Sequence, residues 1–328
     1  LFQHQTLEKE SARQVLIKLA NGEYNASQMA AFLTVFQLRN ITLEELQGFR
    51  EALLELCIPI VLSEFNTIDL CGTGGDQKDT FNISTLASFV VAGAGEKVVK
   101  HGNYGVSSVC GSSNILEYFG YEFTNNQDRL KRELETSGIC FLHAPLFNPA
   151  MKNIAPIRRE LSVKTFFNML GPMVNPSSPK NQLVGVFNLE LARMYNYIYQ
   201  KTGVNYTIVH SLDGYDEISL TGDFQVLSNQ LNSIISPSDI GFLRLEAIDI
   251  KGGVTIEESA RIFMNILEGN GTTAQNNAVI ANASFALKSI YPEKSIKECI
   301  EKARYSLESR KALNSFQKLT QVKEFNSL

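Results

Sequence analysis

A glycine-rich loop is the first feature of this sequence that could do chemistry. Residues 72–76 read Gly-Thr-Gly-Gly-Asp, and Asn82-Ile83-Ser84-Thr85 begins the next helical pattern. Closely spaced glycines allow a tight turn that points several N–H groups into one concavity, where an anion can bind. The dipole of a helix that begins near Ser84 favours phosphate at the same place. Taken alone, the loop could also be an ordinary tight turn before a helix that Ser84 or Thr85 caps.

A second polar loop follows the next predicted strand. Lys100-His101-Gly102-Asn103 ends that strand, and Ser107-Ser108 and Gly111-Ser112-Ser113 come after it. Lysine supplies a point charge, and the hydroxyl and N–H groups supply donors, which is the set that a polyanion requires. His101 has no Cys or His at metal-ligand spacing, so taken alone it is expected to be structural. Both loops should lie at the carboxyl edge of one sheet, where ligands of open α/β sheets bind.

Two pairs of adjacent charged residues are further candidates for binding a metal or a ligand. Asp216-Glu217 follows an apolar strand, and carboxylate oxygens of this kind bind Mg²⁺ together with substrate phosphates. Adjacent side chains of a regular strand point to opposite faces, so joint metal binding requires an irregular backbone. Arg158 or Arg159 could hold a carboxylate ligand, and chemistry alone does not choose between them. For each pair alone, a solvated turn or helix face is the alternative.

Several common chemistries lack support. A GxGxxG fingerprint would need glycine at position 77, which is Gln77, and the Gly-Lys-Ser/Thr of a Walker A loop is absent. The sequence has no GxSxG elbow, and its four histidines suggest no Ser-His-Asp arrangement. Nucleophilic catalysis therefore has little support.

The composition limits the class of protein further. The 328 residues carry 30 Lys+Arg and 34 Asp+Glu, for a net charge of −4. Mild acidity is not typical of nucleic-acid-binding proteins, and no apolar run predicts a membrane span. The five cysteines lack ligand spacing and no signal peptide is apparent, so we expect reduced cysteines and a cytoplasmic location.

The predicted elements divide the chain into two parts. Residues 1–64 show only helical patterns, with a capping box at Thr42 and Glu45, and the chain from Thr255 is mainly helical again. Between these parts, short apolar runs alternate with helical stretches, which predicts an α/β domain over 65–328 with a mainly parallel central sheet. The expected strands lie near residues 67–71, 97–102, 121–123, 139–144, 182–187 and 205–211. These residues predict a two-part α/β enzyme that binds a magnesium-complexed polyphosphate.

Five motifs in register resemble those of the anthranilate phosphoribosyltransferases. They are GTGGD at 72–76, NIST at 82–85, KHGN followed by two serines at 100–108, NPAMKNIAPIRREL at 148–161 and NMLGPMVNP at 168–176. The resemblance implies a fold of the nucleoside phosphorylase and phosphoribosyltransferase type, with helices near 163–180 joining the N-terminal helical domain. It implies a site in the cleft between the domains and a homodimer formed through the helical domain. The implied reaction is transfer from 5-phosphoribosyl 1-diphosphate to anthranilate in tryptophan biosynthesis, with Mg²⁺ as cofactor and no nucleic-acid or membrane partner.

The resemblance also implies roles for individual residues. Lys100, Asp216 and Glu217 would be catalytic, and Ser84 would join Asp216 and Glu217 as a Mg²⁺ position. Anthranilate contacts would come from Gly72, Asn103 and Arg158, which selects Arg158 over its neighbour. The implied substrate-binding residues are Gly72, Gly75, Asp76, Thr80, Asn82, Ile83, Ser84, Thr85, Lys100, His101, Gly102, Asn103, Ser107, Ser108, Ser112 and Arg158.

Four positions depart from the pattern of that family. Tyr104 stands where arginine is common, Asn114 where aspartate is usual, His143 where phenylalanine is frequent, and Asn148 where histidine is usual. In that family, the position of Asn148 lines the path by which the aromatic acceptor reaches the site. None of the four departures removes an implied contact with the metal or the diphosphate.

Two other functions remain as alternatives. A pyrimidine nucleoside phosphorylase of the same fold would want a different lysine loop and no Asp-Glu pair. A non-catalytic relative should have lost the carboxylates or the glycine loop and gained basic charge.

Overall fold

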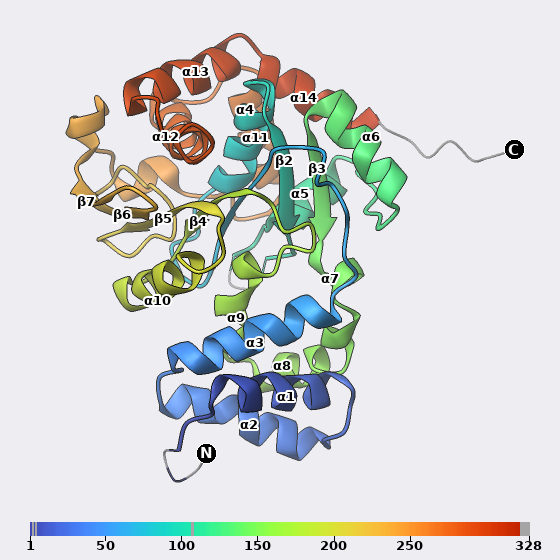
Figure 1. The fold of residues 1–328 in the computed structure, drawn as a ribbon. Coiled ribbons are helices and arrows are strands. Elements are labelled where there is room, and N and C mark those ends of the chain that lie inside the picture. Colours follow the sequence, from blue (N-terminus) through green and yellow to red (C-terminus); the bar gives the residue numbers. More distant parts are fainter. Residues whose placement is uncertain (2, 4, 106–107, 322–328) are drawn as a thin grey trace, which may run out of the picture. The chain divides into compact units, whose positions relative to one another are not determined.

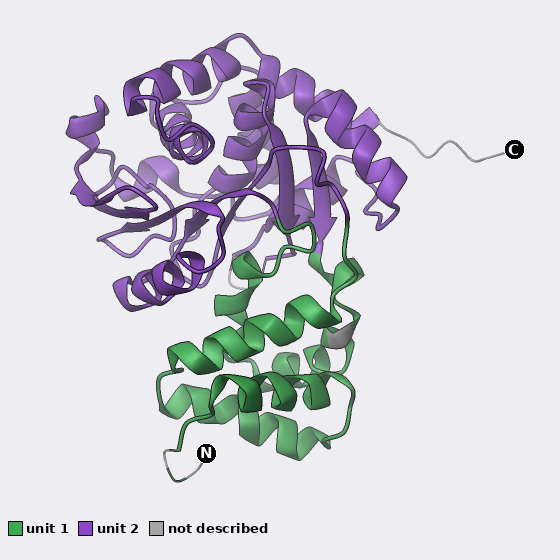
Figure 2. Cartoon of the chain, viewed as in Figure 1, with its two compact units in different colours: residues 1–60, 144–178 green, residues 61–143, 179–328 purple. Residues whose placement is uncertain are grey.

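The computed structural model describes residues 1, 3, 5–105 and 108–321. These residues form two compact units, which Figure 2 colours separately. The first unit comprises residues 1–60 and 144–178, and the second comprises residues 61–143 and 179–328 apart from the undescribed ones. The segment 144–178 therefore belongs to the first unit, although in the sequence it lies between two parts of the second.

The first unit is helical, as the sequence predicts. Leu16 on α1 and Phe49 on α3 are buried, and Phe49 stacks on Phe166 with ring centroids 4.5 Å apart. The predicted capping box is present, because Thr42 accepts from the N–H of Glu45 and the Glu45 side chain accepts from the N–H of Thr42. The α-helices of this unit are α1 (Lys9–Ala20), α2 (Ala26–Leu38), α3 (Leu43–Leu56), α7 (Ala144–Phe147), α8 (Ala155–Leu161) and α9 (Phe167–Leu170).

A seven-stranded sheet forms the centre of the second unit, with the strand order β3-β2-β1-β4-β5-β6-β7 (Figure 1). The first five strands pair in parallel, and β6 and β7 add an antiparallel hairpin at one edge. The predicted mainly parallel sheet is confirmed. The strands are β1 (Thr67–Gly72), β2 (Lys97–Gly102), β3 (Ile139–His143), β4 (Asn181–Gly185), β5 (Asn205–Ser211), β6 (Phe224–Ser228) and β7 (Asn232–Ile235).

Helices cover this sheet and bury its apolar core. Helix α4 is almost wholly buried and packs against α12, α13 and α14, so a continuous core connects β1 and α4, which flank the glycine loop, with the C-terminal helices. Capping boxes are also expected at Thr255 with Glu258 and at Ser295 with Glu298. The box at Ser295, which begins α13, is complete, whereas at the start of α11 Thr255 accepts from the N–H of Glu258 but the Glu258 carboxylate accepts from the N–H of Val254. The α-helices of this unit are α4 (Ile83–Gly93), α5 (Ser112–Tyr118), α6 (Gln127–Ser137), α10 (Leu189–Tyr199), α11 (Ile256–Leu267), α12 (Thr273–Ile290), α13 (Ile296–Glu308) and α14 (Lys311–Gln321).

Two local expectations were wrong or incomplete. Residues 121–123 do not form a strand. Tyr121 instead donates to the buried carboxylate of Glu133, and the Phe123 ring packs beside Phe141, so side-chain packing fixes this segment without a ladder. The β6-β7 hairpin was not predicted. Among the described residues, no helix has the length and apolar character that crossing a membrane requires.

Candidate active site

The glycine loop follows β1 with a backbone that turns sharply several times. Gly74 and Gly75 have positive φ angles of 65° and 82°, and Gln77 and Asp79 also adopt the left-handed region, at 62° and 52°. Glycine reaches this region without strain, whereas Gln77 and Asp79 reach it at some cost. The loop is therefore a constrained conformation, as expected for a site that presents N–H groups to a ligand.

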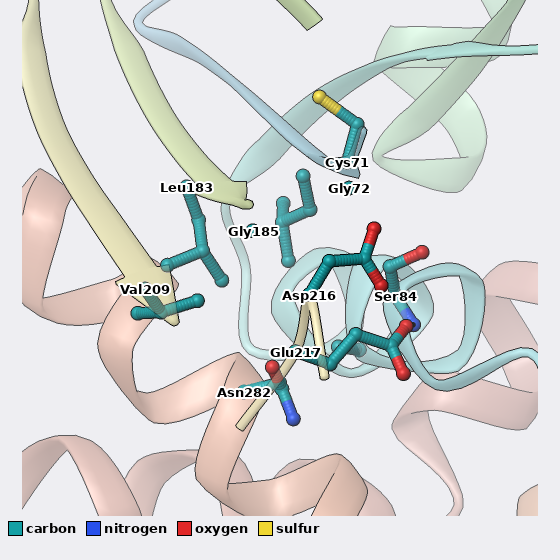
Figure 3. Close-up of a pocket in the computed structure, with 11 residues that line it drawn as sticks. Cys71, Gly72, Ser84, Leu183, Gly185, Val209, Asp216, Glu217 and Asn282 are labelled. Carbon is teal, nitrogen blue, oxygen red and sulfur yellow. Dashed lines mark hydrogen bonds between the residues drawn. The ribbon is translucent and has the colours of Figure 1, made fainter. Parts of the chain in front are cut away.

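Asp216 and Glu217 lie beside this loop. Both residues are in irregular backbone after β5, and both carboxylates point toward the start of α4 (Figure 3), which is the condition that joint metal binding requires. Oδ2 of Asp216 accepts a hydrogen bond from the Gly74 N–H at 2.6 Å. Oε2 of Glu217 accepts from the Thr80 hydroxyl at 3.2 Å. The structure thus brings the predicted loop and the predicted carboxylates together.

The start of α4 is capped differently from the prediction. Neither Ser84 nor Thr85 caps the helix, whose N-cap is Asn82 without a side-chain capping bond. The Asn82 amide instead donates to the carbonyl oxygen of Cys110 at 2.9 Å, which ties the first loop to the second. Oε1 of Glu217 accepts from the backbone N–H of Ser84 at 3.3 Å. A carboxylate from a distant segment therefore satisfies one free N–H group and lies at the positive end of the helix dipole.

Two glycines make room for Asp216. Gly72 ends β1, Gly185 ends β4, and the two are paired in register. A Cβ atom on Gly72 would overlap Oδ2 of Asp216, and one on Gly185 would overlap its carbonyl oxygen. No larger residue fits at either position while Asp216 stays in place.

Burial and mutual repulsion disfavour the charged forms of Asp216 and Glu217. Burial raises the pKa of Asp216 to about 7, and the nearby negative charge of Asp76 adds to the effect. Burial also raises the pKa of Glu217 well above its usual range, with repulsion from Asp216 and Asp76 as further causes. Bringing a divalent cation to this place would relieve the repulsion.

The donor set fits Mg²⁺ in a particular way. Within the described ranges, no cluster of three or more His, Cys, Asp or Glu side chains forms a complete metal cage. Mg²⁺ is usually bound by one or two carboxylates, waters and substrate phosphates instead. Asp216 and Glu217, with the Ser84 side chain lining the same small cavity, match that donor set (Figure 3).

Lys100 and His101 end β2 beside β1. The Lys100 side chain is only 2% exposed, and its Nζ donates to the carbonyl oxygen of Leu70 at 2.6 Å. Burial lowers the pKa of Lys100, and the charges of Asp69 and Glu217 oppose that shift. The backbone N–H of His101 donates to the buried Asp69 carboxylate at 3.1 Å. The positive charge of Lys100 thus lies inside the unit, close to the acidic groups.

The other predicted substrate-binding residues fall into three groups. Ile83 and Thr85 have buried side chains, so only their backbone groups remain for a ligand. Asn103, Ser108 and Ser112 belong to the second polar loop, where the Ser112 hydroxyl donates to the carbonyl oxygen of Asn103 at 3.3 Å. Ser107 lies outside the described residues.

Arg158 lies on α8 in the helical unit. Its Nη2 donates to the Asn168 side chain at 3.2 Å, and its guanidinium is 5.1 Å from the centroid of the Phe167 ring. Its Nε is buried and has no hydrogen-bond partner in the described part of the chain. Burial lowers the pKa of Arg158. A partly buried cation with an unused donor is suited to an anionic ligand.

Sequence reasoning missed one residue that positions the carboxylates. Asn282 of α12 accepts from the N–H of Ile218 at 3.1 Å and donates to the carbonyl oxygen of Ile218 at 2.9 Å. It thereby fixes the backbone directly after Glu217. The available signal was a single asparagine within the apolar run Ala278–Leu287.

Family models match both parts of the chain. The helical bundle domain of the glycosyl transferase family matches residues 1–57, and the a/b domain of that family matches residues 64–313. The chain is therefore a two-part glycosyl transferase by fold and family.

Curated relatives and solved structures show which family of glycosyl transferases the chain resembles. The chain is 62% identical over 322 residues to the anthranilate phosphoribosyltransferase of Flavobacterium psychrophilum and 55% identical over 322 residues to that of Bacteroides fragilis, covering 98% of this chain and 97% of each relative. The crystal structure of the Thermus thermophilus enzyme matches with a TM-score of 0.89 and 32% identity, over 96% of this chain and 95% of that one. The Saccharomyces cerevisiae enzyme in complex with PRPP and Mg matches with a TM-score of 0.87 and 26% identity, over 95% and 92%. The chain belongs to the anthranilate phosphoribosyltransferase family, as its motifs predicted.

Proposed function

We propose that this chain transfers the phosphoribosyl group of 5-phosphoribosyl 1-diphosphate to the amine of anthranilate. The products are N-(5-phosphoribosyl)anthranilate and diphosphate, in the synthesis of tryptophan. The observation that carries the proposal is the joining of a constrained glycine loop to the buried Asp216 and half-buried Glu217 carboxylates through Gly74 and Thr80. Relatives named for this reaction support it along nearly the whole chain.

The glycine loop and the start of α4 would bind the diphosphate. Breaking the anomeric C–O bond leaves positive charge on the ribose and negative charge on the departing diphosphate. Backbone N–H groups of Gly75 and of the loop, together with the Lys100 charge, would stabilise that negative charge in a preorganised site. Mg²⁺ held by Asp216, Glu217 and Ser84 would neutralise part of the same charge. The remaining donor contacts would come from Asp76, Thr80 and the serines of the second loop.

Arg158 and Asn103 would hold the anthranilate carboxylate. The arylamine nitrogen then attacks the anomeric carbon from the face opposite the diphosphate, so the configuration inverts. As the C–N bond forms, the nitrogen gives up a proton, which water or the departing diphosphate accepts. An arylamine is a weak base whose nitrogen is already nucleophilic, so positioning matters more than activation. No strong general base is required.

The proposal also covers the domain boundaries, the oligomeric state and the cellular location of the chain. We propose a helical domain of residues 1–64, joined by helices near 163–180, and an α/β domain of residues 65–328. A homodimer formed through the helical domain is supported by exposed apolar side chains there, with Leu38 77% and Val163 49% exposed. Five free cysteines support a reducing location such as the cytoplasm.

Loss of anthranilate fluorescence tests the function directly. The purified chain should consume anthranilate only when donor and Mg²⁺ are both present, so each is omitted in turn. Phosphorolysis of thymidine or uridine without anthranilate consumption would favour the phosphorylase alternative. Absence of both activities in a folded chain would favour the non-catalytic one.

A further inference from the structure

A buried histidine at the end of β3 lies outside the residues to which the sequence implied a role. His143 is 6% exposed and pairs in register with Gly102. Its ring stacks on Phe123, with centroids 4.3 Å apart, and meets the Tyr104 ring edge-on at 4.9 Å. Its Nδ1 lies 2.9 Å from the Ser113 hydroxyl oxygen. Three side chains from different segments thus fix this ring in one orientation.

Two of these neighbours hold Asn103 directly. The backbone N–H of Ser113 donates to the carbonyl oxygen of Asn103 at 3.1 Å. The backbone N–H of Tyr104 donates to Oδ1 of Asn103 at 2.8 Å. With Oδ1 engaged by Tyr104, and with no partner for its NH₂ group among the described residues, the Asn103 amide can offer that group to a ligand. An NH₂ group is the kind of donor that a carboxylate accepts from.

The same loop is closed by two further side chains. Oδ1 of Asn114 accepts from the N–H groups of Gly105 and Gly111, at 3.0 and 2.9 Å. The Tyr104 hydroxyl donates to Glu117 at 3.2 Å. Three of the four departures from the family pattern, Tyr104, Asn114 and His143, therefore lie in one cluster around the ends of this loop. These side chains therefore support one loop together.

We propose that His143 is a positioning residue that, through Tyr104 and Ser113, holds the Asn103 amide in the orientation that binds the carboxylate of anthranilate. The ring acts through its neighbours and needs no contact with either substrate. This inference rests on the proposed function, because Asn103 matters only if an acceptor carboxylate binds there.

The variant H143A tests the proposal. Removing the ring frees both Tyr104 and Ser113, so the KM for anthranilate should rise about three- to tenfold while the KM for the donor stays within about twofold. The variant H143F keeps the contacts with Phe123 and Tyr104 but loses the Ser113 partner, so its anthranilate KM should fall between those of the wild type and H143A. Titration of anthranilate fluorescence without donor measures the same loss independently of turnover.

A double variant and a control complete the experiment. Because Tyr104 and His143 support each other through their ring contact, which each single variant already removes, Y104A/H143A should raise the anthranilate KM no more than the stronger single variant. Y291F removes another hydroxyl of the same unit, which donates to Glu96 at 2.8 Å, and should change neither KM. If H143A does not fold, Y104A tests the same ring contact from the Tyr104 side. This variant should fold, because the Tyr104 ring is partly exposed.

The outcomes separate the two proposals. A lower melting temperature in H143A with both KM values unchanged would show a purely structural role and overturn this inference alone. Equal increases in the two KM values would overturn it as well. A folded wild-type chain that consumes no anthranilate would overturn the proposed function, and this inference with it.

Discussion

The backbone N–H of Gly74 donates a hydrogen bond to Oδ2 of Asp216 at 2.6 Å, although 142 residues separate them in the sequence. The glycine loop and the Asp216 carboxylate, which we propose bind phosphate and metal, are therefore joined directly. A substitution at either residue should alter the conformation of the other, because the Asp216 carboxylate accepts a hydrogen bond from one of the N–H groups of the loop.

The role of Asp216 in metal binding is tested by D216N. The amide keeps the size of the side chain but loses its charge, so kcat should fall about 10²-fold or more and the dependence on Mg²⁺ should weaken. Folding should persist, because the change removes a buried charge. Measurement of kcat against Mg²⁺ concentration gives the answer. D223N alters an exposed carboxylate paired with Arg244 and should behave like the wild type. Wild-type turnover in D216N at ordinary Mg²⁺ would remove the metal role.

Arg158 is expected to bind the acceptor and not the donor. R158A should raise the KM for anthranilate about tenfold or more, because the ion pair with the carboxylate is lost, and should change the donor KM by less than about twofold. R159A changes an exposed neighbour and serves as the matched control. Steady-state kinetics with each substrate varied in turn separates the two cases. Equal effects of R158A on both substrates would contradict the assignment.

The close packing at Gly185 predicts a large effect of one methyl group. In G185A the new Cβ would overlap the carbonyl oxygen of Asp216, so the segment that carries both carboxylates must move. We expect the free energy of unfolding to fall by about 3 kcal/mol and kcat to fall with it. Urea denaturation and kinetics check both. In G171A the added Cβ meets no atom within 4 Å, so stability should change little. Similar stabilities of the two variants would show that the site is less rigid than described.

Glu133 should give the protein a pH-dependent stability. It is fully buried, accepts from Arg129 Nε at 3.1 Å and from the Tyr121 hydroxyl at 2.8 Å, and burial raises its pKa from 4.5 to about 7. The folded state therefore keeps a proton that the unfolded chain has already lost. The contribution of this group to stability is complete below pH 4.5 and is lost as the pH rises toward 7, by at most about 1.4 kcal/mol per pH unit.

The variant E133Q isolates this effect, because glutamine does not titrate. Denaturation curves at about pH 5 and about pH 7.5 should show a smaller loss of stability with rising pH in E133Q than in the wild type. Parallel changes in the two proteins would mean that Glu133 is already ionised in the folded state at the lower pH.

The sequence by itself determined the parts that depend on local spacing. The alternation of short apolar runs with helices predicted the parallel strands, and the motifs at 72–76, 100–103 and 216–217 predicted which chemical groups the site would contain. Capping boxes such as that of Thr42 and Glu45 were also readable, because residues of one turn satisfy each other's hydrogen bonds. The prediction of a strand at 121–123 was wrong because aromatic residues are typical of strands, whereas here Tyr121 and Phe123 contact side chains distant in the sequence.

Only the tertiary structure decided how those groups are arranged. It made Glu217, and not Ser84 or Thr85, the acceptor at the start of α4. It bonded Asn282 to the backbone of Ile218, directly after the carboxylates, and packed His143 against Tyr104, which follows Asn103; these residues are too far apart in the sequence for a local pattern to predict the contacts. The physical reason is that local backbone preferences act over a few residues, whereas these contacts form only when packing of the core brings separate strands and helices together.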